Sequence, residues 1–428
     1  MNTIDIFKEY SKIEHCSGNT KKMLEYLINK AKEYKYEYET DKTGNLYIFK
    51  KKSKVCFQAH YDMVCIGSAP ILDLYEEDNC IKAHNSSLGA DNGIGVAIIL
   101  GLMEQGKNIS GLFTNDEEIG LIGANNLNID IKENLMINLD SEEEDGVFIG
   151  CAGGTNFKVE IPLEMNYVES KIDLDYYKIE ISGLPGGHSG LEINSNIDNA
   201  IKEIFKVINT CAIELVSVSA GEKINSIPKY AKLIVGITKG DSLKIYHNKV
   251  TVTKLDIKNQ KILKNTQSII SMINDFENGM LEFNPELKVP HTSINLALMD
   301  TDDKKITLEL SGRSMSTENL KDLRENTERY FTKRGFFVSS NDNYPAWKPE
   351  ITDFSNLVLE ESKKVFPKSE FKAMHAGLEC AVIKAKQNHL SIVSIGPNIY
   401  SPHTDKERVE IESIYKITKL IDNILKQL

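Results

Sequence analysis

The chain has 428 residues, of which 41% are hydrophobic and 26% charged, which is typical of a soluble protein with room for two domains. Its formal net charge of −11 argues against a nucleic-acid or membrane partner, because nucleic acids and anionic membranes bind basic surfaces. No apolar run reaches membrane-spanning length, the N-terminus has no signal-peptide pattern, and the seven cysteines are scattered without a CxxC pair. We therefore expect a cytoplasmic protein with reduced thiols and no disulfide framework.

The first part of the chain alternates strand-like and helical segments. Apolar residues recur at helical spacing from Leu24 to Ala31, and further helices are predicted at 95–106 and at the C-terminus, 412–428. Short apolar runs predict strands at 55–60, 109–115, 134–140 and 389–397. This alternation predicts an α/β fold with a mostly parallel sheet and helices on both faces.

The middle of the chain has a different pattern. Alternating apolar residues predict strands at 176–183, 231–237, 292–300 and 305–312. Amphipathic helices are predicted along an apolar face from Ile197 to Ile208 and between residues 316 and 335. We therefore expect an inserted α+β domain with an antiparallel sheet, residues 168–345, within a domain formed by residues 1–167 and 346–428.

Metal-competent side chains follow the ends of the four strands predicted in the α/β domain. Ligands of open α/β sheets bind beyond the carboxyl ends of the strands, so these side chains are expected to converge in one crevice. In chain order they are His60 with Asp62, Glu117 with Glu118, Asp140, and His403.

The residue types favour a site for two metal ions. His60 and Asp62 point to the same side of an extended chain, so Asp62 can orient the imidazole ring. Asp91 lies between glycines at the start of an apolar helix, where the backbone can bend and bring its carboxylate close to an ion. Nitrogen and oxygen ligands without thiolate suit zinc, manganese or cobalt. The excess of carboxylates favours a bridging acid, with one carboxylate left over as a base.

Each cluster alone has a simpler explanation. The HxD pair is common, DEE is more often a solvated loop, and GADNG is more often a turn. The charge run after Asp140 fits a solvated segment. The remaining histidines without a convincing partner are His15, His84, His247, His291 and His389. The occurrence of all five clusters in order favours a metal site.

The motifs QAHYDMV, SLGADNGIG, DEEIGLIGA, NLDSEEE, CAGG, GGHSG, HAGLEC and SIGP…SPH occur in this order. The order resembles that of the M20 metallopeptidases, in the branch of the aminoacyl-histidine dipeptidases. The resemblance covers nearly the whole chain. It implies a catalytic α/β domain that carries two zinc ions, and an inserted lid domain.

The resemblance also implies a role for each site residue. The implied metal ligands are His60, Asp91, Glu118, Asp140 and His403. Asp91 would bridge, His60 would share its ion with Asp140, and Glu118 would share its ion with His403. Asp62 would orient the His60 site and Glu117 would be the general base. The Asp91–Asn92 peptide bond is expected to be cis.

The substrate-binding residues implied by the resemblance lie in the inserted domain. His188 of GGHSG would steady the developing oxyanion, although a histidine in a glycine-rich turn is the simpler explanation. Asn225 and Arg313 would hold the free carboxylate of the substrate, for which the guanidinium fork is suited. His375 and Glu379 are expected near the substrate or behind the metal ligands. Because His188, Asn225 and Arg313 lie in the inserted domain and the metal ligands lie in the other one, we expect the lid to move.

The chain departs from the family beside the first ligand. Tyr61 stands where many members have an aliphatic residue, and Cys65 stands where a proline is common. Neither is a ligand position. We therefore expect both to alter the substrate-side pocket rather than the chemistry.

Together these observations predict a zinc-dependent dipeptidase for unblocked dipeptides, with Xaa-His substrates favoured and a possible homodimer. Another M20 amidohydrolase, such as a tripeptidase or an N-acyl-amino-acid deacylase, is the nearest alternative. A non-catalytic binding protein on the same scaffold would be expected to lack Glu117 or a ligand. A nucleotide site at GADNGIG is disfavoured, because Asp91 would repel phosphate.

Overall fold

The computed structural model describes residues 2–163, 167–170, 173–243, 245 and 247–428. It divides into two compact units, each with its own hydrophobic core. The first unit comprises Met1–Cys151, Trp347–Ala373 and Gly377–Leu428, and the second comprises Ala152–Ala346 and Met374–Ala376.

The first junction between the units precedes the predicted boundary at residues 167/168. Strand β9 (Gly153–Pro162) pairs with β20 (Lys305–Ser314), which places β9 in the sheet of the second unit. Strand β8 (Gly146–Cys151) belongs to the sheet of the first unit. Because Ala152 alone separates the two strands, no linker marks the junction in the sequence.

The first unit is built on an eight-stranded sheet with the order β1-β2-β6-β3-β7-β23-β8-β22. Its centre is parallel, and the four parallel strands confirm the predicted runs: they are β6 (Ser110–Thr114), β3 (Val55–His60), β7 (Leu135–Asn138) and β23 (Ser391–Ser394). All six residues of β3 are buried, so both faces of the sheet are covered, since successive side chains point to opposite faces. The flanking strands are β1 (Glu37–Thr40), β2 (Leu46–Phe49), β8 and β22 (Glu370–Met374).

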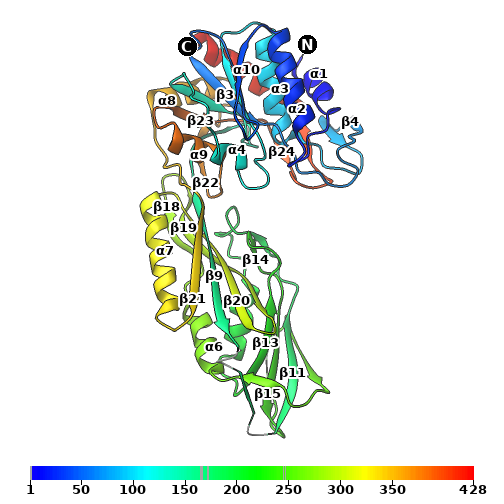
Figure 1. Cartoon of the computed structure of the whole chain (residues 1–428), viewed down its shortest axis with the longest axis vertical. Helices are drawn as coiled ribbons and strands as arrows, with labels where there is room; N and C mark the ends of the chain where they lie inside the picture. The colour runs from blue at the N-terminus through cyan, green and yellow to red at the C-terminus, as the bar shows by residue number, and fades with distance from the viewer. Residues whose placement is uncertain (1, 164–166, 171–172, 244, 246) are drawn as a thin grey trace. The chain divides into compact units, whose positions relative to one another are not determined.

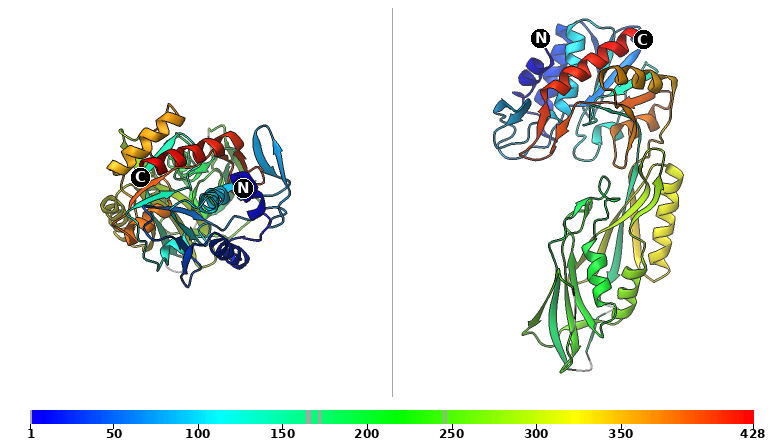
Figure 2. Two further views of the ribbon diagram at one scale, coloured as in Figure 1. Left: turned by 90° about the horizontal axis from the view of Figure 1, so that it is seen from above. Right: turned by 180° about the vertical axis from the view of Figure 1, so that it is seen from behind.

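Helices of the first unit pack against this sheet. The apolar helix α3 (Ala90–Glu104) contacts β3 and α1 (Thr3–Tyr10). Helix α8 (Asp353–Val365) lies beside α10 (Ile411–Gln427), as Figures 1 and 2 show. The buried residues of α10 recur at helical spacing, which explains why this segment forms an amphipathic helix. The remaining helices of this unit are α2 (Lys21–Glu33), α4 (Ile122–Asn125) and α9 (Glu379–Lys386).

A smaller sheet of the first unit connects the segment after His403 to the segment before Asp91. Its order is β24-β25-β5-β4. Strand β25 (Arg408–Glu410) pairs with β5 (Cys80–Ala83), which precedes α3 in the chain. The other two strands are β4 (Leu74–Glu77) and β24 (Ile399–Tyr400).

A disulfide joins Cys16 and Cys65, so the prediction that all thiols are reduced is wrong. The Cα atoms of the two cysteines are 5.5 Å apart, a normal disulfide spacing. The chain brings them together because the segment around Cys16 pairs with Met63, whose N–H donates to the carbonyl of His15 at 3.0 Å. Sequence spacing could not show this pairing. The free cysteines are Cys56, Cys80, Cys151, Cys211 and Cys380.

The second unit is built on a nine-stranded sheet with the order β16-β11-β15-β13-β19-β20-β9-β21, to which β18 adds beside β19. The pairings along it are antiparallel, as predicted. The strands not yet given bounds are β11 (Leu174–Ile181), β13 (Glu214–Ala220), β15 (Ala231–Thr238), β16 (Val250–Leu255), β18 (Gly279–Asn284), β19 (Val289–Thr301) and β21 (Phe337–Tyr344).

In the second unit two helices, α5 (Ala200–Ile208) and α7 (Thr317–Thr332), pack against the strands, and a third, α6 (Thr266–Asp275), packs against α5. The predicted apolar face of α5 is buried, but Ile197 lies outside the helix, because Asn199 caps it by accepting the N–H groups of Ile201 and Lys202. Helix α7 confirms the second predicted helix, with Ser316 as its N-cap.

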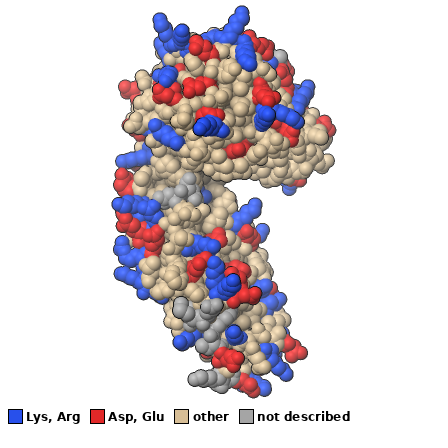
Figure 3. Space-filling model, in the orientation of Figure 1, with Lys and Arg blue, Asp and Glu red and all other residues tan. Residues whose placement is uncertain are grey.

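The surface is of mixed charge. Figure 3 shows lysine and arginine side chains interspersed with aspartate and glutamate over both units on the face drawn. Among the described residues, no helix has the length and apolar character that crossing a membrane requires.

Candidate metal centre

The structure brings all five predicted metal ligands together in the first unit. His60 is the last residue of β3, Glu118 follows β6, and Asp140 follows β7. Asp91 lies in the first turn of α3, and His403 follows β24. His60, Glu118 and Asp140 therefore lie at the carboxyl ends of parallel strands, as the sequence predicted. Asp91 and His403 join them from α3 and from the segment after β24.

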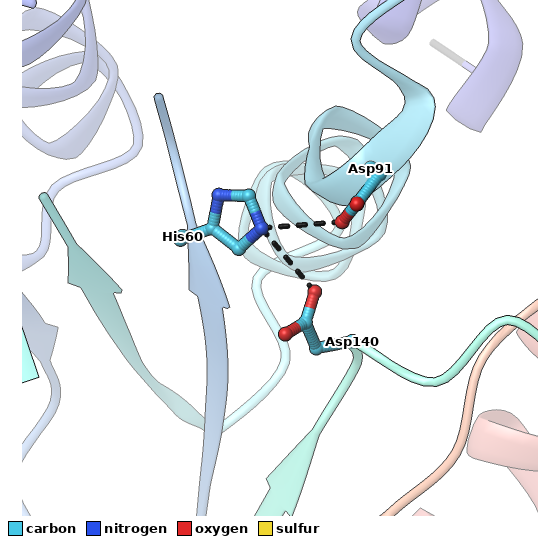
Figure 4. Close-up of side chains that lie close together, drawn as sticks. All are labelled: His60, Asp91 and Asp140. Carbon is cyan, nitrogen blue, oxygen red and sulfur yellow. Dashed lines mark hydrogen bonds and ion pairs between the residues drawn. The ribbon is translucent and has the colours of Figure 1, made fainter. Parts of the chain in front are cut away.

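The Asp91 carboxylate lies between the two histidines. Its Oδ1 is 3.2 Å from His60 Nε2, and its Oδ2 is 3.1 Å from His403 Nε2. Asp140 Oδ1 lies 3.4 Å from His60 Nε2. Figure 4 shows that Asp91 and Asp140 both approach this nitrogen. Glu118 Oε2 lies 2.8 Å from His403 Nε2. The carboxylate of Asp91 thus belongs to two groups of potential ligands.

The two groups meet the requirements of divalent cations. His60, Asp91 and Asp140 form one of three such groups, and Asp91, Glu118 and His403 form another, with ligand atoms within 4.8 Å of one another in each. Glu118 Oε1 is buried and has no hydrogen-bond partner among the described residues. A buried carboxylate oxygen without a donor is costly unless a cation binds it. The donor set therefore fits two metal ions that share Asp91.

Asp62 supports His60 from behind. His60 Nδ1 lies 3.1 Å from the Asp62 carbonyl and 3.5 Å from its carboxylate, so Asp62 can accept the Nδ1 proton and leave Nε2, which faces Asp91 and Asp140, as the nitrogen that would bind a metal ion. The Asp62 carboxylate also accepts Ser17 Oγ at 2.7 Å and the Glu117 N–H at 2.9 Å. Burial opposes the ionisation of Asp62, but the hydrogen bond and charge of His60 outweigh it and lower its pKa.

The three acids of the DEE run have separate environments. Asp116 Oδ1 accepts the N–H of Gly18 at 2.6 Å, and its φ of 53° places it in a tight turn, so it fixes the loop. Glu118 faces His403. Glu117 forms a further group with His60 and Glu118. Burial raises the pKa of Glu117 well above its usual value, and the charges of Asp140 and Glu118 add to this rise.

The sequence did not indicate that Asn92 takes part in the site. Its Nδ2 donates to Asp140 Oδ1 at 2.6 Å and to the Leu139 carbonyl at 2.8 Å. It therefore fixes the rotation of a predicted ligand. The Asp91–Asn92 peptide bond is cis, as the resemblance predicted. A second missed residue, Glu407, binds the backbone that carries Asp91.

The predicted substrate-binding residues lie in the second unit. His188 Nδ1 accepts the N–H groups of Gly190 and Leu191 at 3.2 and 3.1 Å. Asn225 is exposed, and its carbonyl accepts the Ser189 N–H at 2.9 Å. Burial and the charge of Arg313 lower the pKa of His188 to about 4. The ring is therefore neutral at pH 7 and carries its proton on Nε2.

Gly190 lets two of these residues approach each other. A Cβ atom at Gly190 would lie 3.1 Å from His188 Cε1, 3.2 Å from Arg313 Nε and 2.4 Å from the His375 carbonyl oxygen. Arg313 itself is only 6% exposed and donates to the Tyr344 hydroxyl at 2.5 Å. Gly190, the last glycine of GGHSG, therefore lets His188 lie beside Arg313.

His375 and Glu379 lie in different units. His375 Nε2 is 2.7 Å from Ser293 Oγ in the second unit. Glu379 is buried in the first unit, where it accepts hydrogen bonds from Gln58 and Thr114, each at 2.6 Å. Burial raises the pKa of Glu379 to about 7. It is not part of either group of potential ligands.

Tyr61 does not face the ligands. Its hydroxyl donates to the Gly44 carbonyl at 2.8 Å, and the side chain is 1% exposed. The expectation that Tyr61 reshapes the substrate-side pocket is therefore wrong. Successive residues of an extended chain point to opposite sides, so Tyr61 points away from His60 and Asp62.

Comparison with known proteins identifies the family. No family model matches the chain. The structure resembles that of aminoacylhistidine dipeptidase from Vibrio alginolyticus, with a TM-score of 0.85 and 25% identity over 100% of this chain and 96% of that chain. It shares its fold with an M20 family metallo-carboxypeptidase from Sulfolobus solfataricus, with a TM-score of 0.55 and 14% identity over 100% and 99% of the chains.

The sequence is 30% identical to cytosol non-specific dipeptidase from Escherichia coli (strain K12), over 99% of this chain and 97% of the relative. The chain belongs to the M20 family of metallopeptidases. The resemblance read from the motifs is thus confirmed. As an M20 metallopeptidase, the chain is a metal-dependent hydrolase of peptide bonds, and its groups of potential ligands are compatible with divalent metal ions.

Proposed function

We propose that this M20 metallopeptidase is a dipeptidase that hydrolyses unblocked dipeptides and favours substrates with a C-terminal histidine. The observation that carries the proposal is the Asp91 carboxylate, which presents one oxygen to His60 and the other to His403. The relation to a dipeptidase over nearly the whole chain supports the substrate class. The likeness to an aminoacylhistidine dipeptidase supports the preference for histidine.

We assign two divalent cations, as zinc, to this site. His60, Asp91 and Asp140 would hold one ion, and Asp91, Glu118 and His403 would hold the other. Bound there, the ions would supply Lewis acidity, which polarises the scissile carbonyl and makes water more acidic. Asp62 and Asn92 would keep His60 and Asp140 in their orientations.

Glu117 is assigned as the general base. Its carboxylate would take the proton of the attacking water and return it to the leaving amine nitrogen. Its burial, which raises the pKa, suits a group that must hold this proton between the two steps. The hydrogen bond from its N–H to Asp62 fixes its backbone relative to His60.

Residues of the second unit are assigned to the substrate. The neutral His188 would donate from Nε2 to the oxyanion, since its Nδ1 is already occupied as an acceptor. Arg313 and Asn225 would hold the free carboxylate. The name of the Escherichia coli relative supports a cytoplasmic location, and a homodimer remains a prediction.

A substrate panel tests the proposal. The metal-loaded enzyme is expected to cleave free dipeptides, with Xaa-His pairs among the best substrates, and to leave their N-acetylated forms and tripeptides nearly untouched. Preferential cleavage of tripeptides or of acylated amino acids would favour the alternative M20 activities. Binding of dipeptides without any cleavage, in wild type and in Glu117→Gln alike, would favour a non-catalytic binding protein.

A further inference from the structure

Glu407 binds the backbone at the start of α3. Its Oε2 accepts the N–H groups of Leu88 and Gly89 at 2.7 and 3.0 Å, and its Oε1 accepts those of Ala90 and Asp91 at 2.8 and 3.2 Å. The side chain is only 4% exposed. One buried carboxylate thus accepts four consecutive backbone donors.

This carboxylate holds the turn that leads into the regular part of α3, since Asp91 and Asn92 have non-helical backbone angles. The first N–H groups of a helix lack partners within the helix and are usually satisfied by a nearby side chain. The N-cap of α3 is Gly89, which makes no such bond. The acceptor comes instead from Glu407, which is 316 positions from Asp91 in the chain. A carboxylate is suited to this place because charge-assisted hydrogen bonds from consecutive backbone N–H groups favour negative charge.

The same carboxylate connects two of the potential ligands. Asp91 donates its own N–H to Glu407, while its side chain faces His403. His403 lies in the loop that ends at Glu407, and the Glu407 N–H donates to the Thr404 carbonyl at 3.3 Å. Beyond it, Arg408 pairs with Lys82 in the smaller sheet. Glu407 is therefore held on both sides while it holds the turn that carries Asp91.

We propose that Glu407 is a positioning residue, which fixes the turn of Asp91 and the loop of His403 in one register so that both can bind the same metal ion. The inference rests on the proposed bridging role of Asp91. Ligand supports of this kind typically contribute 10- to 100-fold to metal affinity. A cap that served only the helix would affect stability without a selective effect on the metal ions.

Glu407→Gln is the main test. Gln has nearly the same size, but its NH2 group would face two of the four backbone donors. Zinc is titrated calorimetrically into the metal-free full-length protein. We expect at least one of two binding steps to weaken by about 10- to 100-fold. We also expect faster hydrogen exchange of the amides of residues 88–91, because they lose their acceptors.

Glu410→Gln is the matched control. Glu410 lies at the end of β25, shortly after Glu407 in the chain, and accepts Asn398 Nδ2 at 2.9 Å, away from α3. This variant loses the same charge and should bind zinc as wild type does. Should Glu407→Gln fail to fold, Glu407→Asp keeps the charge but retracts the carboxylate, and it too should weaken a binding step.

The outcomes separate this inference from the proposed function. If wild type binds two ions and the folded Glu407 variants bind zinc as tightly as wild type, the positioning role is overturned and the proposed function is not. A wild-type protein that binds only one ion overturns the shared role of Asp91 and the inference with it. Loss of zinc affinity in Glu410→Gln to the same extent would show a general charge effect and would also overturn it.

Discussion

Adjacent carboxylates in the DEE run illustrate how environment separates the roles of identical side chains. Glu118 faces His403, Glu117 is buried near Asp140, and Asp116 accepts the backbone N–H of Gly18. Glu117 and Glu118 lie at a turn rather than in an extended strand, and both offer an oxygen to one group with His60, so their separate assignments rest on the contact of Glu118 with His403. The proposed base and the proposed ligand can therefore be tested independently.

Glu117→Gln should retain both metal ions and lose at least about a hundredfold in kcat, because the amide cannot take a proton from water. Glu118→Gln should instead bind one ion more weakly and regain part of its activity at high zinc concentration. Metal content and steady-state kinetics of the two variants check this. Asp116→Asn is the control, since it keeps an acceptor for Gly18, and its kcat should stay near that of wild type. Metal loss in the Glu117 variant with metal retained in the Glu118 variant would reverse the assignment.

Arg313→Ala should raise the KM for dipeptides by about tenfold or more, because a charge-assisted hydrogen bond to the substrate carboxylate contributes about 1.5–3 kcal/mol. The metal content should not change. Arg334→Ala is the matched control in the same unit, since Arg334 is exposed and contacts Tyr330, donating to its carbonyl at 2.8 Å and lying over its ring. Unchanged dipeptide kinetics in Arg313→Ala would remove this residue from the substrate site.

At the scale of elements, the pairing of the Cys16 segment with the end of β3 supports the proposed metal centre. Ser17, next to Cys16, donates both to the Asp62 carboxylate and to the Met63 carbonyl. The disulfide thus closes a segment that reaches Asp62. Cytosolic proteins seldom keep stable disulfides, so the state of this pair also bears on the proposed cytoplasmic location.

Cys65→Ser should lower the free energy of unfolding by about 4 kcal/mol at most, the value for closing a loop of this length. The sequence separation of the two cysteines is 49. Thermal unfolding with and without reductant measures the effect, and reductant should destabilise wild type to a similar extent. Cys211→Ser, at a free cysteine, should leave the sensitivity to reductant unchanged. Equal stability of wild type in both conditions would mean that the pair does not contribute.

The elements show what the sequence could predict. Buried parallel strands such as β3 are continuous apolar runs and are visible directly, and the ligands at their ends lie in local motifs. The sequence did not show that β9 belongs to the second unit, because one residue separates β8 from β9 and yet the two strands enter different sheets. Glu407 and the Cys16–Cys65 pair were missed for a related reason. Their partners are distant in sequence, and only folding brings them together.

At the scale of the whole molecule, the proposed ions should stabilise the first unit, since its ligand carboxylates repel one another without them. Chelation should abolish activity, and zinc or manganese should restore it. At a free metal concentration a thousandfold above Kd, binding to the folded state adds about 4 kcal/mol. Calorimetry should therefore show a higher unfolding temperature for the metal-loaded protein. An identical unfolding temperature with and without chelator would contradict the site.

The two units should also respond separately to acid, because each contains a buried histidine. Burial lowers the pKa of His15 in the first unit to about 4 and that of His375 in the second to about 3. Unfolding returns both to an ordinary pKa near 6.5, so the unfolded chain binds more protons between about pH 6.5 and these values. Stability should therefore fall as the pH is lowered through this window, by on the order of 3 kcal/mol for His15.

Replacement of each histidine should flatten the acid dependence of its own unit. His15→Gln keeps a donor for the Ile13 carbonyl but cannot gain a proton, so its stability relative to wild type should rise as the pH falls from 7 to 4. His375→Gln should do the same for the second unit. Calorimetry of the chelated protein across this range checks both, with the exposed His84→Gln as control. Because each unit has its own core, we expect two unfolding transitions, each affected by one variant. A single transition shifted by both variants would mean instead that the two cores unfold together.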